Sequence, residues 1–137
     1  KLGCVIMKRI IKMITAFTVA ICLTVNAFAA NPVTGGDYVG TLKSTAYSQY
    51  SKRFSARTQN TNESVDEIFA GLSVNDYYTG GQYDYNDDRN YNSDDVRTYC
   101  YVSYGSGAKK VTSFGAHSAY DNGKQTCMLY SSHNFTI

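Results

Sequence analysis

Residues 110–133 read KVTSFGAHSAYDNGKQTCMLYSSH, and this stretch decides the fold class that the sequence predicts. Asn122-Gly123 at its centre is the strongest short signal for a β-hairpin with a type I′ turn. On both sides of the turn, small or apolar residues alternate with polar ones, as in strands that bury one face. In regular register, a two-residue loop gives three cross-strand pairs: Tyr120 with Gln125, Ser118 with Cys127, and Ala116 with Leu129.

The same alternation extends towards the N-terminus. In residues 96–104 one face carries Val96, Thr98, Cys100, Val102 and Tyr104. Residues 46–58 suit one long strand with a wetted face, whereas residues 31–37 (NPVTGGD) and 59–64 (QNTNES) predict a loop and a turn.

Residues 65–74 fit two structures. Ser64-x-x-Glu67 resembles a helix capping box, but the segment also alternates strictly, and Gly71 costs about 1 kcal/mol inside a helix. We choose a strand. The sequence therefore predicts an all-β fold, a small antiparallel β-sandwich of about five to seven strands, with a single twisted meander as the alternative.

The first 29 residues have the pattern of an export signal. A basic segment, an apolar run and a small-residue cleavage site follow one another: Lys8, Arg9 and Lys12, then Met13 to Val25, then Ala27-Phe28-Ala29. This order predicts cleavage before Ala30 and a secreted, extracellular protein of bacterial type.

Two alternatives to cleavage are an uncleaved anchor and lipid attachment at Cys22. The apolar run is shorter than the about 20 residues that a membrane span needs, and the bulky Ile21 disfavours lipid attachment. Met7 is the expected start, and residues 1–6 are expected to be a gene-calling artefact or the edge of a fragment.

Residues 30–137 suffice for one domain and not two. They contain nine Lys and Arg against eleven Asp and Glu, so the basic charge of the whole chain belongs to the signal. A nucleic-acid partner is therefore not expected, nor a membrane span after cleavage. Leu, Ile, Val and Phe supply only 16 of these residues, but all 13 tyrosines lie among them, so Tyr is expected to supply buried area.

Signal cleavage would leave two cysteines, Cys100 and Cys127, in an oxidising compartment. A bridge between them would stabilise the domain by roughly 3 kcal/mol. Because a disulfide needs Cα atoms within about 7 Å, their strands would have to be neighbours or face each other across two sheets. We expect this disulfide.

Residues 79–95 (TGGQYDYNDDRNYNSDD) contain no aliphatic residue and predict a long polar loop, which in a small domain is often functional. Six oxygen-bearing side chains occupy positions 1, 3, 5, 7, 9 and 12 of an EF-type calcium loop: Asp84, Asn86, Asp88, Asn90, Asn92 and Asp95. These twelve residues resemble the loop of dockerin modules, although Arg89 replaces the usual Gly. A solvated loop without a cofactor is the preferred interpretation, and calcium binding is the alternative.

Tyrosines cluster in and before this loop: Tyr77, Tyr78, Tyr83, Tyr85 and Tyr91. Exposed Tyr beside Asn and Asp suits stacking on sugar rings or contact with another protein, so these five are the candidate ligand-binding residues. The strand tyrosines are expected to substitute for missing aliphatic residues in the core.

Catalysis has two candidate bases at neutral pH, His117 and His133. Either could join a serine or an acid such as Asp121 or Glu67 in a hydrolytic site. No hydrolase motif accompanies them, and a hydrogen-bonded strand histidine is the preferred interpretation. The sequence thus predicts a non-enzymatic, secreted binding module for an extracellular glycan, cell wall or protein; the alternatives are a bacteriocin-like toxin and then a small hydrolase.

Overall fold

A computed structural model of the chain describes residues 28–29, 32–105 and 107–137, and nine strands lie in these ranges. Their bounds are β1 (Phe28–Ala29), β2 (Val33–Gly35), β3 (Tyr38–Ser48), β4 (Ser51–Asn60), β5 (Val65–Asp76), β6 (Gln82–Ser93), β7 (Asp95–Ser103), β8 (Lys110–Asp121) and β9 (Lys124–Thr136). No helix in these ranges is long and apolar enough to cross a membrane. The predicted export signal lies outside the described residues, except for β1.

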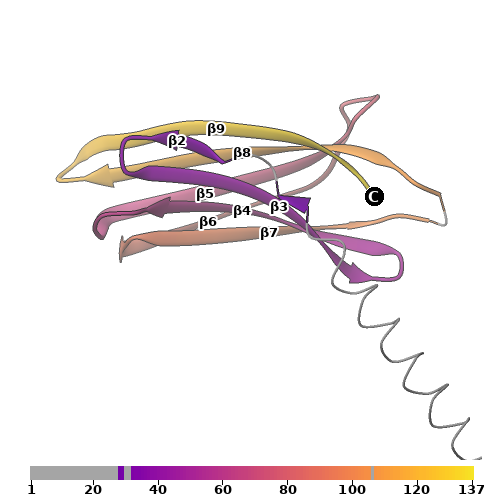
Figure 1. The fold of residues 1–137 in the computed structure, drawn as a ribbon, viewed down its shortest axis with the longest axis horizontal. Helices are drawn as coiled ribbons and strands as arrows, with labels where there is room; N and C mark the ends of the chain where they lie inside the picture. The colour runs from indigo at the N-terminus through magenta and orange to yellow at the C-terminus, as the bar shows by residue number, and fades with distance from the viewer. Residues whose placement is uncertain (1–27, 30–31, 106) are drawn as a thin grey trace, which may run out of the picture.

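The strands form two antiparallel sheets that lie face to face (Figure 1). Sheet 1 has the order β1-β3-β4-β7, with β2 also paired to β3, and sheet 2 has the order β6-β5-β8-β9. Between the sheets, β7 packs against β5 and β6, while β3 packs against β8 and β9. The prediction of an all-β fold is confirmed. There are more strands than expected because β1 and β2 are short additions to the edge of β3, residues 46–58 are divided between two strands, and residues 82–93 form β6.

One local prediction is confirmed, one holds in part and two are wrong. Residues 65–74 lie in a strand, β5. Of the turn predicted over 59–64, residues 61–64 form the connection before β5, whereas Gln59 and Asn60 belong to β4. The single strand expected over 46–58 is instead two strands joined by a turn at Gln49-Tyr50, since Tyr38–Ser48 pairs with Ser51–Asn60. The loop expected over 31–37 contains β2.

The β8–β9 hairpin has the predicted turn and a corrected register. Asn122 and Gly123 both have positive φ, 51° and 71°, as a type I′ turn requires. Tyr120 pairs with Gln125 as expected, but a β-bulge then shifts the register, so that Cys127 lies opposite Ala119 instead of Ser118. One extra residue in β9 turns Cys127 towards the core.

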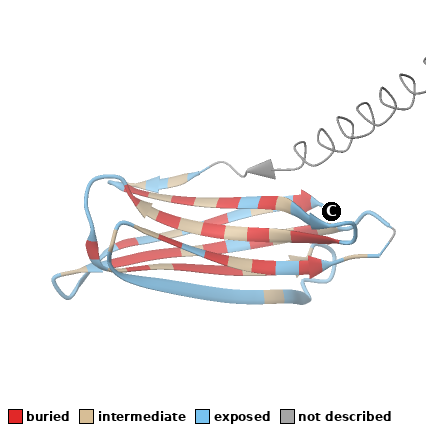
Figure 2. Ribbon diagram, turned by 90° about the horizontal axis from the view of Figure 1, so that it is seen from below, coloured by how far each residue is buried: buried red, intermediate tan, exposed pale blue. Residues whose placement is uncertain are grey.

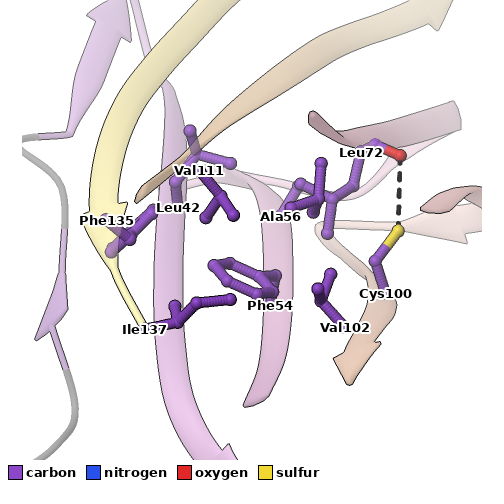
Figure 3. Close-up of a cluster of buried hydrophobic side chains, with 10 residues drawn as sticks. Leu42, Phe54, Ala56, Leu72, Cys100, Val102, Val111, Phe135 and Ile137 are labelled. Atoms are coloured by element: carbon purple, nitrogen blue, oxygen red, sulfur yellow. Dashed lines mark hydrogen bonds between the residues drawn. The ribbon is translucent and has the colours of Figure 1, made fainter. Parts of the chain in front are cut away.

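The core between the sheets consists of two apolar clusters. The larger one joins residues of both sheets around the Phe54 and Phe135 rings, whose centroids are 5.5 Å apart (Figure 3). The second lies nearer the β8–β9 turn: Tyr38, Val65, Ile68, Ala70, Val96, Ala119 and Cys127, with Leu129 packed against them. Tyr38 is the tyrosine that the second cluster buries, and most other tyrosines are exposed. Aliphatic residues and Phe therefore supply most of the buried area, contrary to expectation.

The predicted Cys100–Cys127 disulfide is wrong. Both thiols are free and buried, Cys100 on β7 at the edge of sheet 1 and Cys127 on β9 at the edge of sheet 2. Because β7 packs over β5 and β6, the two cysteines lie at opposite margins of the core, at least two strand widths or about 10 Å apart. The Cys100 Sγ instead approaches the Leu72 carbonyl oxygen at 3.5 Å (Figure 3), and burial raises the pKa of Cys100 to about 12.

We expect both thiols to stay reduced and unreactive in the folded protein. Burial raises the pKa of each thiol, so the thiolate that reacts with oxidants and alkylating reagents is scarce. A thiol reagent should label the native protein slowly and label both cysteines at once in denaturant, and reductant should leave the melting temperature unchanged. A melting temperature that falls in reductant would contradict the free thiols.

Residues 82–93, expected to lie in a loop, form the edge strand β6. It pairs with β5 over nearly its whole length and is exposed along almost all of it (Figure 2). Its alternate side chains reach the free backbone edge of β7: Asp84 accepts from the Tyr101 N–H at 2.8 Å, and Asn86 Nδ2 donates to the Tyr99 carbonyl at 3.1 Å. Asn90 likewise donates to the Asp95 carbonyl at 2.7 Å. Side chains of β6 thus cap the free backbone edge of β7, where the two sheets meet.

Removing these contacts should loosen β7 selectively. In the double variant Asp84→Ala/Asn86→Ala two backbone groups of β7 lose their partners, at a cost of roughly 1 kcal/mol each. Hydrogen exchange at the Tyr101 amide should accelerate, while amides of β8 keep their protection. Asp87→Ala, a change at an outward position of the same strand, is the control. Equal loss of hydrogen-exchange protection in both proteins would contradict the role of Asp84 and Asn86 in capping β7.

Candidate functional site

The outer face of sheet 2 carries most of the exposed aromatic residues that lie on strands. In register across β6, β5, β8 and β9, its outward residues form four rows: Tyr91, Glu67, Tyr120 and Gln125; Arg89, Phe69, Ser118 and Met128; Asp87, Gly71, Ala116 and Tyr130; Tyr85, Ser73, Phe114 and Ser132. Tyr91, Tyr130 and Phe114 are 63%, 71% and 50% exposed. We call this surface the aromatic face.

An open depression of about 300 Å³ lies in the aromatic face, lined by Glu67, Phe69, Arg89, Ser118 and Tyr120. Three strands contribute to it, so its shape is fixed by the sheet and not by a loop. Two aromatic rings and three polar side chains line it, the combination that positions small ligands in most binding sites.

Internal contacts hold the floor of the depression in place. Gly71 has no side chain, and a Cβ at that position would lie 3.2 Å from the Phe69 ring, so the ring leans along β5 over the glycine. The Arg89 guanidinium lies 5.4 Å from the centroid of the same ring and donates to Glu67 at 2.8 Å. The ring and two opposite charges are therefore preorganised.

The row that crosses the middle of the aromatic face has its smallest residues, Gly71 and Ala116, on the two central strands, whereas the rows on both sides carry Phe69 and Phe114. The Phe69 ring leans over Gly71 and covers part of this row. Tyr85 and Phe114 lie on the side of the row away from the depression. Aromatic rings therefore extend beyond the residues that line the depression.

The five tyrosines predicted to bind a ligand do not form one site. Tyr85 and Tyr91 lie on the aromatic face, at its β6 edge. Tyr77, Tyr78 and Tyr83 instead surround the β5–β6 turn, where the Tyr83 hydroxyl donates to Asp76 at 2.7 Å and helps to hold the pKa of Asp76 at about 2. Lys110 Nζ lies 3.7 Å from the Tyr77 ring centroid. Tyr78 and Tyr83 line a separate open depression of about 360 Å³ at this turn.

The six residues of the candidate calcium loop are not arranged around a common point. Asp84, Asn86, Asp88 and Asn90 alternate along an extended strand, about 7 Å apart from one to the next, and Asp95 pairs with Arg57 at 2.7 Å. Asn92 has a positive φ of 49° near the end of β6. In the part of the chain that the structure describes, no group of three or more His, Cys, Asp or Glu is placed to hold a metal ion.

His117 is fully buried between the two apolar clusters, in a polar network that joins the sheets. The Thr58 hydroxyl donates to the Phe69 carbonyl at 2.7 Å, so its oxygen accepts from His117 Nδ1 at 2.9 Å. Nε2 is then unprotonated and accepts from the Ser131 hydroxyl at 2.8 Å. Gly40 leaves room for the ring, because a Cβ there would lie 2.5 Å from it.

Neither histidine is placed for hydrolysis with the acids proposed from the sequence. His117 faces the core, whereas Glu67 lies on the outer face of the same sheet and Asp121 at the β8–β9 turn. His133 is half-buried, and its ring packs against Phe135 with centroids 4.6 Å apart. His117 is the hydrogen-bonded strand histidine that the sequence favoured.

Comparison with known proteins adds no family to this geometry: no family model matches the chain, and neither a curated protein nor a solved structure is significantly similar to it.

The sequence interpretation missed seven residues of the aromatic face: Phe69, Arg89, Phe114, Ser118 and Met128, together with Tyr120 and Tyr130, which it expected in the core. The signal for Phe69 and Phe114 was present, because each alternates with inward residues on a predicted strand and so stands on the polar side. The signal for Arg89 was its shared parity with Tyr85 and Tyr91, which a loop assignment conceals. Met128 faces outward only because of the bulge in β9.

His117 should make the fold sensitive to acid. Burial lowers the pKa of His117 to about 4, below the 6.5 of an unfolded histidine, so the unfolded state binds the proton more tightly. This contribution to stability is complete above pH 6.5 and is lost as the pH falls towards 4, by about 3 kcal/mol in total. Urea unfolding at stepped pH measures it.

His133→Gln is the matched control and should keep this pH dependence. His117→Gln should be less stable at pH 7 and should lose most of the dependence between pH 6.5 and 4. The interpretation fails if the His117 variant retains the full slope.

Proposed function

We propose that this chain is a secreted, non-enzymatic binding module, built as a β-sandwich, that holds an extended glycan against the aromatic face. The observation that carries the proposal is the preorganised depression, in which the Phe69 and Tyr120 rings lie beside the Glu67–Arg89 ion pair and the Ser118 hydroxyl. Sugar rings present apolar C–H faces that stack on aromatic rings, with hydroxyl groups around their rims. A carboxylate, a guanidinium and a hydroxyl supply both acceptors and donors for those groups.

The extent of the aromatic face supports a polymeric ligand over a single small molecule. Tyr85, Phe114 and Tyr130 are half exposed or more, and they lie on the aromatic face beyond the residues that line the depression. Soluble domains rarely leave so many large apolar side chains on one face unless that face binds something.

A binding role is favoured over glycoside hydrolysis by the composition of the site. Hydrolysis by the common mechanisms needs two carboxyl groups at opposed positions around one sugar. Among the described residues that line the depression, Glu67 is the one carboxylate, and it is engaged with Arg89.

A pelleting assay with insoluble polysaccharides and bacterial cell walls tests the proposal. We expect saturable co-sedimentation of residues 30–137 with at least one of these materials. Tyr120→Ala and Tyr85→Ala/Tyr91→Ala should each raise the dissociation constant by roughly tenfold, since loss of a stacked ring costs about 1 kcal/mol or more. Tyr50→Ala, which removes an exposed ring at the β3–β4 turn, should bind as the parent protein does.

Three outcomes would overturn the proposal. Equal weakening by Tyr50→Ala would show that the interaction is not located on the aromatic face. No binding to any polysaccharide, together with capture of a purified surface protein, would assign the face to a protein partner. No binding together with growth inhibition of bacterial strains would favour the bacteriocin-like alternative.

A further inference from the structure

The outer face of sheet 1, on the opposite side of the molecule, concentrates positive charge. Four of the nine Lys and Arg in residues 30–137 lie at outward positions of β3, β4 and β7: Lys43, Arg53, Arg57 and Arg97. Of the eleven acids, Asp95 is the one at an outward position of these three strands, all of which the structure describes. At these strand positions the surplus is three positive charges, on a domain whose net charge is slightly negative. Asp94, directly before β7, also acts electrostatically on Arg57.

Two of these cations stand directly opposite each other. Arg57 on β4 and Arg97 on β7 are cross-strand partners, an arrangement in which like charges repel and destabilise a sheet. Arg57 is compensated by two bonds to Asp95, at 2.7 and 2.9 Å. Neither Arg97 nor Lys43 has an acid within ion-pair distance among the described residues. Arg97 and Lys43 lie on either side of β4, and their charges are left for an external anion.

Tyrosines border this cationic strip. The Arg53 guanidinium lies 5.1 Å from the Tyr99 ring centroid, which fixes the cation on the sheet surface. The Tyr47 and Tyr101 rings meet edge to face, with centroids 4.9 Å apart, and are 62% and 47% exposed. The strip therefore offers both positive charge and ring faces that sugars can stack on.

We propose that the outer face of sheet 1 binds an extended acidic polysaccharide, one that carries carboxylate or phosphate groups on successive sugar units. Arg53 and Arg57 are about 13 Å apart along β4, and Lys43 and Arg97 flank them on strands about 5 Å to either side. Cations spread along a strip fit a repeating anion, and guanidinium groups bind both carboxylate and phosphate in bidentate fashion. This surface is independent of the aromatic face.

Affinity electrophoresis through gels with polygalacturonate, dextran phosphate or neutral dextran tests the proposal and separates the two anionic groups. Lys43→Gln/Arg97→Gln removes two charges without breaking an ion pair, and it should weaken retardation by the acidic polymer at least about tenfold. Lys109→Gln/Lys124→Gln, with the same loss of charge elsewhere, should stay within about twofold of the parent protein. Arg97→Lys should retain most of the binding.

Four results would overturn the proposal: no retardation by either acidic polymer, equal weakening in the two double variants, retardation of the Tyr120→Ala protein by neutral dextran as strong as by the acidic polymers, or equally tight binding to single-stranded DNA through the same residues. The last would indicate that phosphate charge alone is recognised. Tyr120→Ala removes a ring of the aromatic face and leaves the outer face of sheet 1 intact. Retardation of this variant by the acidic polymers should equal that of the parent protein, whether or not the aromatic face binds a neutral glycan.

Discussion

The hydrogen-bonded chain Ser131–His117–Thr58–Phe69 is the interaction on which the rest of the core depends. It crosses from sheet 2 to sheet 1 and back, and one apolar cluster lies on each side of it. A domain with so few aliphatic residues cannot fill the space between two sheets with hydrocarbon alone. The histidine ring supplies the missing volume, and its satisfied nitrogens avoid the penalty of a buried polar group without a partner.

Three other buried hydroxyl groups do not make hydrogen bonds of this kind. The side chains of Ser44, Thr98 and Ser113 are buried and, among the described residues, have no hydrogen-bond partner. Each small residue fills a position without adding a bond between the sheets. In the His117 network, by contrast, buried polar side chains bond the two sheets to each other. This network fixes how β4 and β8 face each other.

Much of the fold could be predicted from alternation and turn chemistry, because both are local. Asn122-Gly123 specifies its turn, and strict alternation identifies β5, β7, β8 and β9. The disulfide could not be excluded, because the separation of Cys100 and Cys127 depends on strand order across two sheets. The absence of aliphatic residues predicts a loop at β6, although its alternating Tyr and Asp or Asn already has strand periodicity. The β6 edge of the aromatic face could not be predicted for this reason, since it needs β6 beside β5.

The side chains that close the edge of β7 also have a consequence for how the protein behaves at high concentration. An edge strand with free backbone groups can recruit a strand from another molecule and start aggregation. Here Asp84, Asn86 and Asn90 already occupy part of that hydrogen-bonding row. The carboxylates of β6 add repulsion between molecules. A polar strand that contributes almost nothing to the core therefore limits self-association of the chain through this margin.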